Sequence, residues 1–309
     1  MILLKDGRYS YSALFCAYVR AYHASCDPPH IFNDFLAHRL IPEDIRISLE
    51  HEMVWNFQSH NPGLALLYPD QASTLALIMQ TIITPPAVLG RARYVEDSLE
   101  RAVRDGVKQY VLLGAGMDTF AYRSPEMLEQ LRVFEVDHPA TQAFKLRRVA
   151  ELGWQQPNNL HFVPVDFTTD NLAAVLQDSP YDPQALSFFN WLGVTYYLPS
   201  EAVLATLRTI TEIAPAGSRV VFDYFDSAPL DLGKTSGRVR WWRMEGSDTS
   251  DEPLQTCLDP SRLASDLAGV GLRLQENLSS ADIQDRYFQG RSDGYRALKQ
   301  AHFAMAVVD

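Results

Sequence analysis

The sequence predicts an α/β protein with a doubly wound, mostly parallel sheet of seven strands. Between residues 106 and 227, short apolar segments that end at a glycine or an acid alternate with longer helical segments. Helical patterns dominate the first hundred residues, and two strand-like segments lie near the C-terminus. Such alternation is typical of a parallel sheet with helices on both faces. We therefore expect a ligand site at the carboxyl edge of this sheet.

We expect one domain over residues 1–309, built from four consecutive regions. A helical N-terminal lid would span 1–105, the sheet core 106–227, a cap insertion 228–260, and a C-terminal helix with closing strands 261–309. The helices expected in the lid region are Tyr11–Ala24, Asp70–Ile83 and Ala87–Arg104. Pro85 and Pro86 should separate the last two, and Gly106 suits the left-handed turn after a helix.

Five apolar segments are predicted to form the parallel strands. They are Tyr110–Leu113, Arg132–Asp137, Leu160–Val165, Leu186–Asn190 and Arg219–Phe225. The helices expected between and after them are Pro139–Leu152, Ser200–Ile213 with Ser200 as N-cap, and Pro260–Leu267. Two closing strands, Gly271–Glu276 and His302–Val308, would pair antiparallel at one edge and complete the seven.

Composition excludes several classes of protein. Of the 309 residues, 47% are hydrophobic and 21% are charged, which is typical of a globular chain with a substantial core. No apolar run is long enough for a transmembrane helix or a secretory signal. A net charge of −11 disfavours nucleic acid as a partner. Three cysteines without C-x-x-C spacing favour a reducing compartment, so we expect a cytoplasmic protein without metal or membrane.

The strongest local signal is the glycine-rich turn after the first predicted strand, with Gly114, Ala115 and Gly116. Glycines there allow a tight turn and a close approach of a ligand, although a plain strand-to-helix turn is an alternative. A dinucleotide site favours a third glycine, where this chain has Thr119, and the Asp118 carboxylate would repel a pyrophosphate. The cationic ammonium and sulfonium of S-adenosylmethionine suit this acidic loop better.

Acids at the ends of the next two strands point to an adenosine site. Asp137 follows Gly116 by 21 residues, where such sheets place an acid for the ribose hydroxyls. Asp166 could accept a hydrogen bond from an adenine amino group, and Phe167 could cover the ring. Each acid alone has a simpler interpretation, as a solvated strand end or a helix cap. Their convergence on one sheet edge favours the ligand site.

Several blocks that occur in a fixed order carry a family resemblance. The blocks are Arg91–Asp97, Leu113–Thr119 with Tyr122–Arg123, Val133–Pro139 with Ala143–Lys145, Pro164–Phe167, Trp191–Pro199 and Arg286–Gly294. Together they resemble the leucine carboxyl methyltransferase-like family, from about Ser12 to the C-terminus. The resemblance implies a class I methyltransferase fold and an S-adenosylmethionine-dependent O-methyltransferase of the bacterial branch, often linked with secondary metabolism.

The resemblance also implies roles for individual residues. Arg93 matches an arginine that pairs with the methionyl carboxylate of the cofactor, and Arg20 matches a basic position with a similar role. Gly114 matches the cofactor loop, Asp137 the ribose acid, and Asp166–Phe167 the adenine contacts. Without the resemblance, Arg93 would be an exposed helix charge, and Arg20 a charge at the edge of an amphipathic helix.

One position departs from the family pattern. Many members of the family that this chain resembles carry an acid before the glycine of the fourth-strand motif, where this chain has Leu192. Asn190 or a backbone carbonyl would have to replace that contact to the cofactor.

The sequence assigns no catalytic side chain. The eight histidines form no metal motif, and His138 after the ribose acid more often only shapes the turn. A carboxylate acceptor needs no general base, so this absence favours a carboxylate or acidic hydroxyl of a small molecule. Trp241 and Trp242 in the cap would line the acceptor pocket or simply pack. The rival functions are an NAD-dependent oxidoreductase and a non-catalytic cofactor-binding protein.

Overall fold

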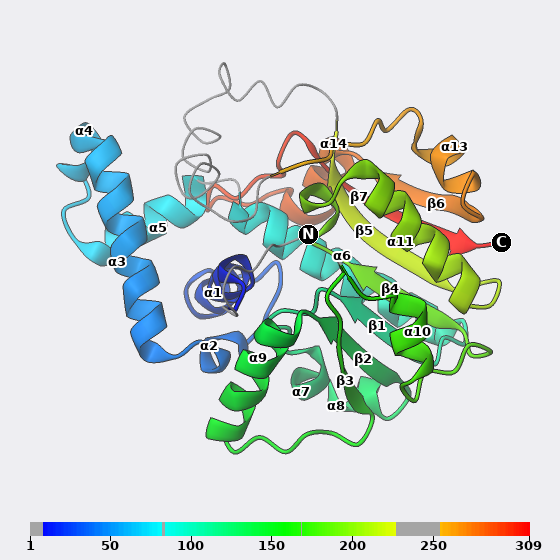
Figure 1. The fold of residues 1–309 in the computed structure, drawn as a ribbon. Coiled ribbons are helices and arrows are strands. Elements are labelled where there is room, and N and C mark those ends of the chain that lie inside the picture. The colour runs from blue at the N-terminus through cyan, green and yellow to red at the C-terminus, as the bar shows by residue number, and fades with distance from the viewer. Residues whose placement is uncertain (1–8, 82–83, 168, 227–253) are drawn as a thin grey trace.

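The computed structural model describes residues 9–81, 84–167, 169–226 and 254–309, and it confirms the predicted fold class. One sheet contains seven strands in the order β3-β2-β1-β4-β5-β7-β6 (Figure 1). The strands are β1 (Gln109–Leu113), β2 (Arg132–Asp137), β3 (Leu160–Pro164), β4 (Ser187–Trp191), β5 (Arg219–Phe225), β6 (Leu272–Leu278) and β7 (Ala301–Val308). β1 to β5 pair in parallel, whereas β7 is antiparallel to both β5 and β6, as expected for closing strands.

Helices cover both faces of the sheet. The N-terminal helices are α1 (Tyr11–Cys26), α2 (Ala37–Leu40), α3 (Glu43–His60), α4 (Pro62–Ala65), α5 (Gln71–Thr81) and α6 (Thr84–Arg104). Those that follow are α7 (Phe120–Arg123), α8 (Pro125–Leu128), α9 (Pro139–Glu151), α10 (Leu172–Gln177), α11 (Ser200–Ile213), α13 (Leu263–Ala268) and α14 (Ser280–Ile283). Two single turns are η2 (Thr195–Tyr197) and η4 (Gln284–Phe288).

Alternation along the strands divides the core into two layers. On β1, Tyr110 and Leu112 face the layer that contains α1, α6 and α9. Val111 and Leu113 face the opposite layer, which contains α10, α11 and α13. All five β1 residues are buried, which is typical of a strand at the centre of a parallel sheet.

Three details of the helices differ from the prediction. The structure begins α6 at Thr84 rather than Ala87, because Pro85 and Pro86 fit a first helical turn that needs no N–H donors. Ser200 is the first residue of α11, not its N-cap, because Pro199 supplies the extended backbone before the helix. The long helix α3 escaped separate prediction because only Leu49, Met53 and Phe57 are buried on it.

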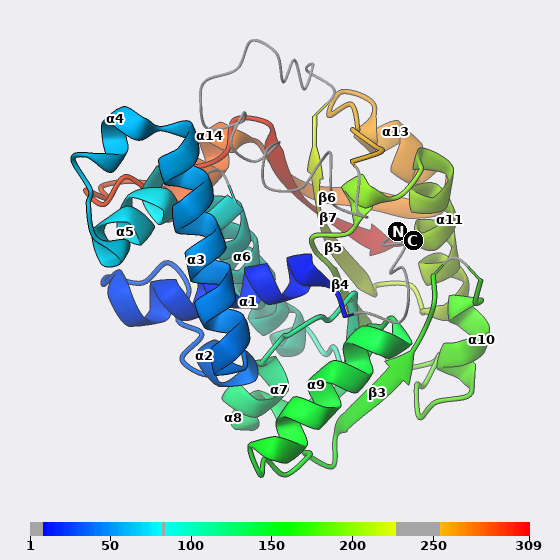
Figure 2. The same cartoon turned by 60° about the vertical axis from the view of Figure 1, so that its left-hand side comes forward.

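The N-terminal helices divide into two groups in space. Figure 2 shows α1 crossing close to α6 and the sheet, while α3, α4 and α5 extend away from it. Ser10 caps α1, and its backbone N–H donates to Thr141 Oγ1 at 3.1 Å, which ties the start of α1 to the start of α9. Helix α1 is therefore anchored beside the end of β2.

The predictions of a cap insertion and of no membrane-spanning helix can be compared only with the described residues. The expected cap at 228–260 lies outside them except for 254–260, and Trp241 and Trp242 lie outside them entirely. Within the described ranges, no single helix has the length and apolarity needed to cross a membrane, although α5 and α6 taken together, bent by 62°, meet both criteria.

Candidate functional site

The predicted glycine turn forms a tight loop directly after β1. Gly114 and Gly116 have φ angles of 80° and 53°, in the left-handed region that favours glycine. The backbone N–H groups of Gly114 and Ala115 donate to the Val136 carbonyl at 2.8 and 3.2 Å, which ties the loop to the end of β2. A Cβ atom on Gly114 would lie only 2.7 Å from Val194 Cγ2, so a larger residue would not fit there.

Asp137 lies at the end of β2 and holds the same loop. Its carboxylate accepts a hydrogen bond from the Gly116 N–H and another, at 2.6 Å, from the His138 N–H. Burial raises the pKa of Asp137, and these two amides oppose the rise. Each carboxylate oxygen has two lone pairs, so the group retains capacity to accept from a diol. The structure thus brings Asp137 to the glycine loop, as expected for a ribose acid.

Asp166 and Phe167 follow β3, the strand that pairs with β2. The Asp166 carboxylate lies 3.9 Å from His138 Nε2, so the two strand-end acids share His138 as a neighbour. His138 itself caps α9, because its Nδ1 accepts from the Ala140 N–H at 3.2 Å. The Phe167 side chain is half-buried and packs against the second core layer. The three strand ends therefore converge, while His138 shapes the turn.

Asn190 lies on β4, next to β1. Its side-chain amide donates to the Tyr110 hydroxyl at 2.8 Å, and both groups are buried between the two strands. Leu192, at the position of the missing acid, is partly buried and packs on the core. The structure places Asn190 below the loop with one donor already engaged, and its contact with a cofactor remains a prediction.

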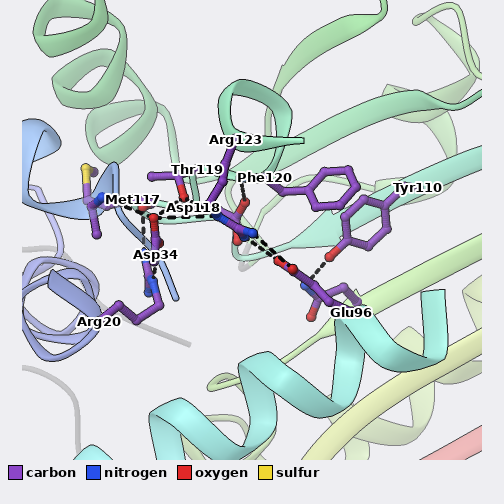
Figure 3. A network of polar contacts seen from close by, with 11 residues as sticks. Arg20, Asp34, Glu96, Tyr110, Met117, Asp118, Thr119, Phe120 and Arg123 are labelled. Carbon is purple, nitrogen blue, oxygen red and sulfur yellow. Dashed lines mark hydrogen bonds and ion pairs between the residues drawn. The ribbon is translucent and has the colours of Figure 1, made fainter. Parts of the chain in front are cut away.

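Arg20 reaches the glycine loop from α1. Its Nη2 donates to the Met117 carbonyl at 2.7 Å, and its Nε donates to Asp34 at 2.9 Å (Figure 3). The side chain is only 12% exposed. Arg20 is therefore a constituent of the loop environment, not a charge at the edge of a helix.

The structure does not bring Arg93 to the loop. Its guanidinium is 50% exposed and pairs with Asp97 one turn along α6, at 2.7 Å. Two residues earlier, Arg91 points inward and is only 12% exposed. Residues two apart on a helix point roughly 200° away from each other, so only one of these arginines can face the sheet. Arg91 therefore faces the sheet and Arg93 faces solvent, and a cofactor contact of either arginine remains a prediction.

Arg91 is the centre of a charged cluster at the ends of β4 and β5. Its Nη1 donates to the Tyr196 hydroxyl at 2.7 Å and to Asp223 at 2.9 Å. The other oxygen of Asp223 accepts from the Gly193 N–H at 2.6 Å. Burial raises the pKa of Tyr196, so the phenol stays neutral. Cys16 of α1 lies 3.5 Å from Arg91 Nη2, so α1 also borders this cluster.

Sequence reasoning missed this cluster because its members come from distant segments. Asp223 lies inside a strand whose neighbours are apolar, and a buried acid in such a strand was the one available signal. Tyr224, the next residue of β5, donates to Asn277 and stacks on His302. Glu135, inside β2, contacts Lys145 of α9.

The strand order, with the glycine loop after β1 and an acid at the end of β2, is that of the class I methyltransferase fold. Comparison with known proteins agrees. The family model described as leucine carboxyl methyltransferase matches residues 13–211. A crystal structure of a DUF574 family protein from Streptomyces avermitilis shares the fold, with a TM-score of 0.54 at 17% identity, over 77% of this chain and 91% of that one.

Two curated relatives have the same description. "Putative S-adenosyl-L-methionine-dependent methyltransferase YktD" of Bacillus subtilis is 35% identical over 304 residues, covering 98% of this chain and 99% of that protein. A Mycolicibacterium smegmatis protein with the same functional description is 32% identical over 199 residues, covering 64% of this chain and 66% of its own. The chain belongs to the leucine carboxyl methyltransferase family.

Proposed function

We propose that this chain methylates an oxygen atom, preferably a carboxylate or an acidic hydroxyl, of a small-molecule acceptor in secondary metabolism. The enzyme class and the cofactor follow from the family: it is a methyltransferase that depends on S-adenosyl-L-methionine. The observation that carries the proposal is the convergence of the glycine loop with Asp137 at adjacent strand ends. The family membership gives that convergence its chemical meaning.

The residues of the site fit this cofactor. Gly114 and Gly116 carry no Cβ atoms, so the loop backbone at these two positions can approach other groups closely. Asp137 would accept from the ribose hydroxyls, and Phe167 beside Asp166 would border the adenine. Arg20 on α1, and Arg91, which contacts Cys16 one turn earlier on the same face of α1, would supply cationic groups for the methionyl carboxylate. The cofactor supplies a methyl group already activated on sulfonium, so the protein needs to orient and desolvate it.

The preference for an acidic acceptor rests on how the ionisable groups at the strand ends are used. Asp137 accepts from two backbone amides, and His138 caps a helix. In this proposal the remaining lone pairs of Asp137 accept from the ribose hydroxyls, and the acceptor nitrogen of His138 is occupied by the Ala140 N–H, so neither group serves as the base. A carboxylate is already deprotonated at neutral pH and needs no such base. The cluster of Arg91, Asp223 and Tyr196 adds hydrogen-bonding groups near the ends of β4 and β5.

The same proposal places the reaction in the cytoplasm, without nucleic acid as a partner. Cys16, Cys26 and Cys257 are all free thiols, as expected in a reducing compartment. The net charge of −11 gives no general attraction to phosphate backbones.

Calorimetry and a product assay test the proposal in sequence. Titration with S-adenosylhomocysteine should show binding, whereas NAD should not bind. Incubation with methyl-labelled cofactor and a panel of carboxylic acids, phenols and amines should then label an oxygen acceptor. Alkali releases methanol from a methyl ester but not from a methyl ether, which separates the two kinds of oxygen acceptor. Label on nitrogen would contradict the proposal, and cofactor binding without transfer across the panel would favour the non-catalytic alternative.

A further inference from the structure

We propose that Asp34 is a positioning residue for cofactor binding, which holds the Arg20 guanidinium against the glycine loop. This inference rests on the proposed function, because it assigns to Arg20 a contact with the carboxylate end of the cofactor. Asp34 lies between α1 and α2, far from the glycine loop in sequence, and belongs to none of the motifs discussed above. Its role emerges only from the contacts drawn in Figure 3.

The Asp34 carboxylate gathers donors from three segments. Its Oδ2 accepts from Arg20 Nε at 2.9 Å. Its Oδ1 accepts from the Thr119 hydroxyl at 2.6 Å and from the Ala37 N–H at 3.1 Å. Thr119 is the residue directly before α7, so one carboxylate joins α1, the start of α2 and the far end of the glycine loop.

Helix α1 contacts the loop at two points. A Cβ atom on Gly116 would lie 3.0 Å from Ala13 Cβ, so the start of α1 rests on the loop. About two turns later, Arg20 Nη2 donates to the Met117 carbonyl. Asp34 fixes the second contact, because it holds Arg20 by Nε and leaves Nη2 directed at that carbonyl. The loop backbone is therefore held between two points of one helix.

The third nitrogen of Arg20 is the one available to a ligand. Within the described ranges, Nη1 has no hydrogen-bond partner, while Nε and Nη2 are both engaged. A guanidinium held by two of its nitrogens loses little further freedom when the third binds an anion. Preorganisation of this kind strengthens binding without adding a contact between Asp34 and the ligand.

Burial explains why a carboxylate is needed at position 34. The side chain is 1% exposed, and Arg123 lies 3.7 Å away in addition to Arg20. Burial alone would raise the pKa of Asp34, but Arg20 and Arg123 outweigh it and lower the pKa, so the group is ionised at neutral pH. An asparagine would present an N–H₂ group to donors on at least one side. It would also leave two buried guanidinium groups short of negative charge.

The network continues from Arg123 to α6. Arg123 donates through both terminal nitrogens to Glu96, a bidentate pair. Asp118, between Met117 and Thr119, accepts from the Phe120 N–H at 2.7 Å and starts α7. These contacts hold the far end of the loop without Asp34. Loss of Asp34 should therefore weaken mainly the contact between Arg20 and the Met117 carbonyl.

Calorimetry with S-adenosylhomocysteine tests the role of Asp34. We expect Asp34→Asn to raise the dissociation constant about tenfold, which corresponds to about 1.4 kcal/mol. Glu276→Gln is the matched control, because Glu276 pairs with Arg286 and Tyr94 on the distant strand β6. It should lower stability in urea while leaving the dissociation constant unchanged. The control thereby separates a specific loss of cofactor affinity from the loss of stability that follows removal of any ion pair.

A double variant tests whether Asp34 acts through Arg20. In an Arg20→Gln background, Asp34→Asn should change the dissociation constant less than about twofold, since the group it positions is already gone. An unchanged affinity of folded Asp34→Asn, or an equal loss in both backgrounds, would overturn the proposal. If Asp34→Asn does not fold, Arg20→Lys replaces it, and wild-type affinity of that variant would likewise overturn the proposal. Failure of the wild-type protein to bind S-adenosylhomocysteine would instead refute the proposed function itself.

Discussion

The two halves of the sheet edge hold their polar groups in different ways. At β1 and β2, the acid Asp137 accepts from backbone amides of its own strand end and of the glycine loop 21 residues earlier. At β4 and β5, Arg91 and Asp223 pair over 132 residues of sequence, and Tyr196 joins them from a third segment. The first half is built from short-range backbone contacts, and the second from buried side-chain charges.

This difference separates affinity from stability. An acid held by backbone amides keeps lone pairs for a ligand, so its loss should affect the cofactor more than the fold. A buried guanidinium and carboxylate depend on each other, because removal of one leaves an uncompensated charge. Variants on the two sides should therefore be distinguished by which measurement they change.

The largest effect should come from Arg91→Met. Asp223 would then remain buried with the Gly193 N–H but without its cation. We expect a loss of about 3–5 kcal/mol in the free energy of unfolding, measured in urea. Asp266→Asn, which removes an exposed partner of Arg262 on α13, is the control and should change little. A loss no larger than the control would show that the β4–β5 cluster does not hold this side together.

Glu135 sharpens the comparison, because it is a buried charge beneath the loop half. Burial raises the pKa of Glu135 to about 7, and Lys145 opposes the rise. Between about pH 4.5 and 7 the unfolded chain therefore releases a proton that the folded protein retains, so stability falls as pH rises. The wild type should lose up to about 3 kcal/mol of unfolding free energy over this interval through Glu135. In Glu135→Gln this contribution should vanish, and identical pH slopes for both proteins in urea unfolding would refute it.

Asp137→Ala tests the β1–β2 half of the sheet edge and should lower cofactor affinity more than stability. We expect the binding of S-adenosylhomocysteine to weaken by about 1–3 kcal/mol, the range for hydrogen bonds to a charged group. Calorimetry on the folded variant measures this directly. Asp166→Ala is an informative companion, since Asp166 lies at the next strand end and its loss should weaken the proposed adenine contact together with the contact to His138. Full affinity in folded Asp137→Ala would remove its assignment as the ribose acid.

The smallest effect should come from Arg93→Ala. Its ion pair with Asp97 is exposed, so both stability and cofactor affinity should change by less than about 0.5 kcal/mol. Arg91→Lys is the matched comparison on the inner face of α6, because lysine keeps the charge but is shorter and lacks the second terminal nitrogen, which contacts Cys16. Weaker cofactor binding in Arg93→Ala alone would return the carboxylate role to Arg93.

The sequence alone determined the strands and the first half of the site. Apolar segments that end at a glycine or an acid predicted the observed bounds of β2 and β5. Parallel pairing of β2 with β3 then placed Asp137 and Asp166 at neighbouring strand ends. These features depend on neighbours within one strand–turn–helix unit, so local pattern was sufficient. The glycine loop followed for the same reason, because its positive φ angles select residue types directly.

Only the tertiary structure decided which charges meet. Arg91 and Arg93 are the same residue type, two positions apart on one helix, and the sequence does not distinguish them. The packing of α6 on the sheet buries Arg91 and leaves Arg93 exposed. Asp34 and Asp223 acquire their partners from segments 14 to 132 residues away, and no local pattern encodes such a distance. Buried charges persist only where the complete fold supplies their counter-charges and hydrogen bonds. Their positions are therefore a property of the assembled packing, which periodicity along the chain does not record.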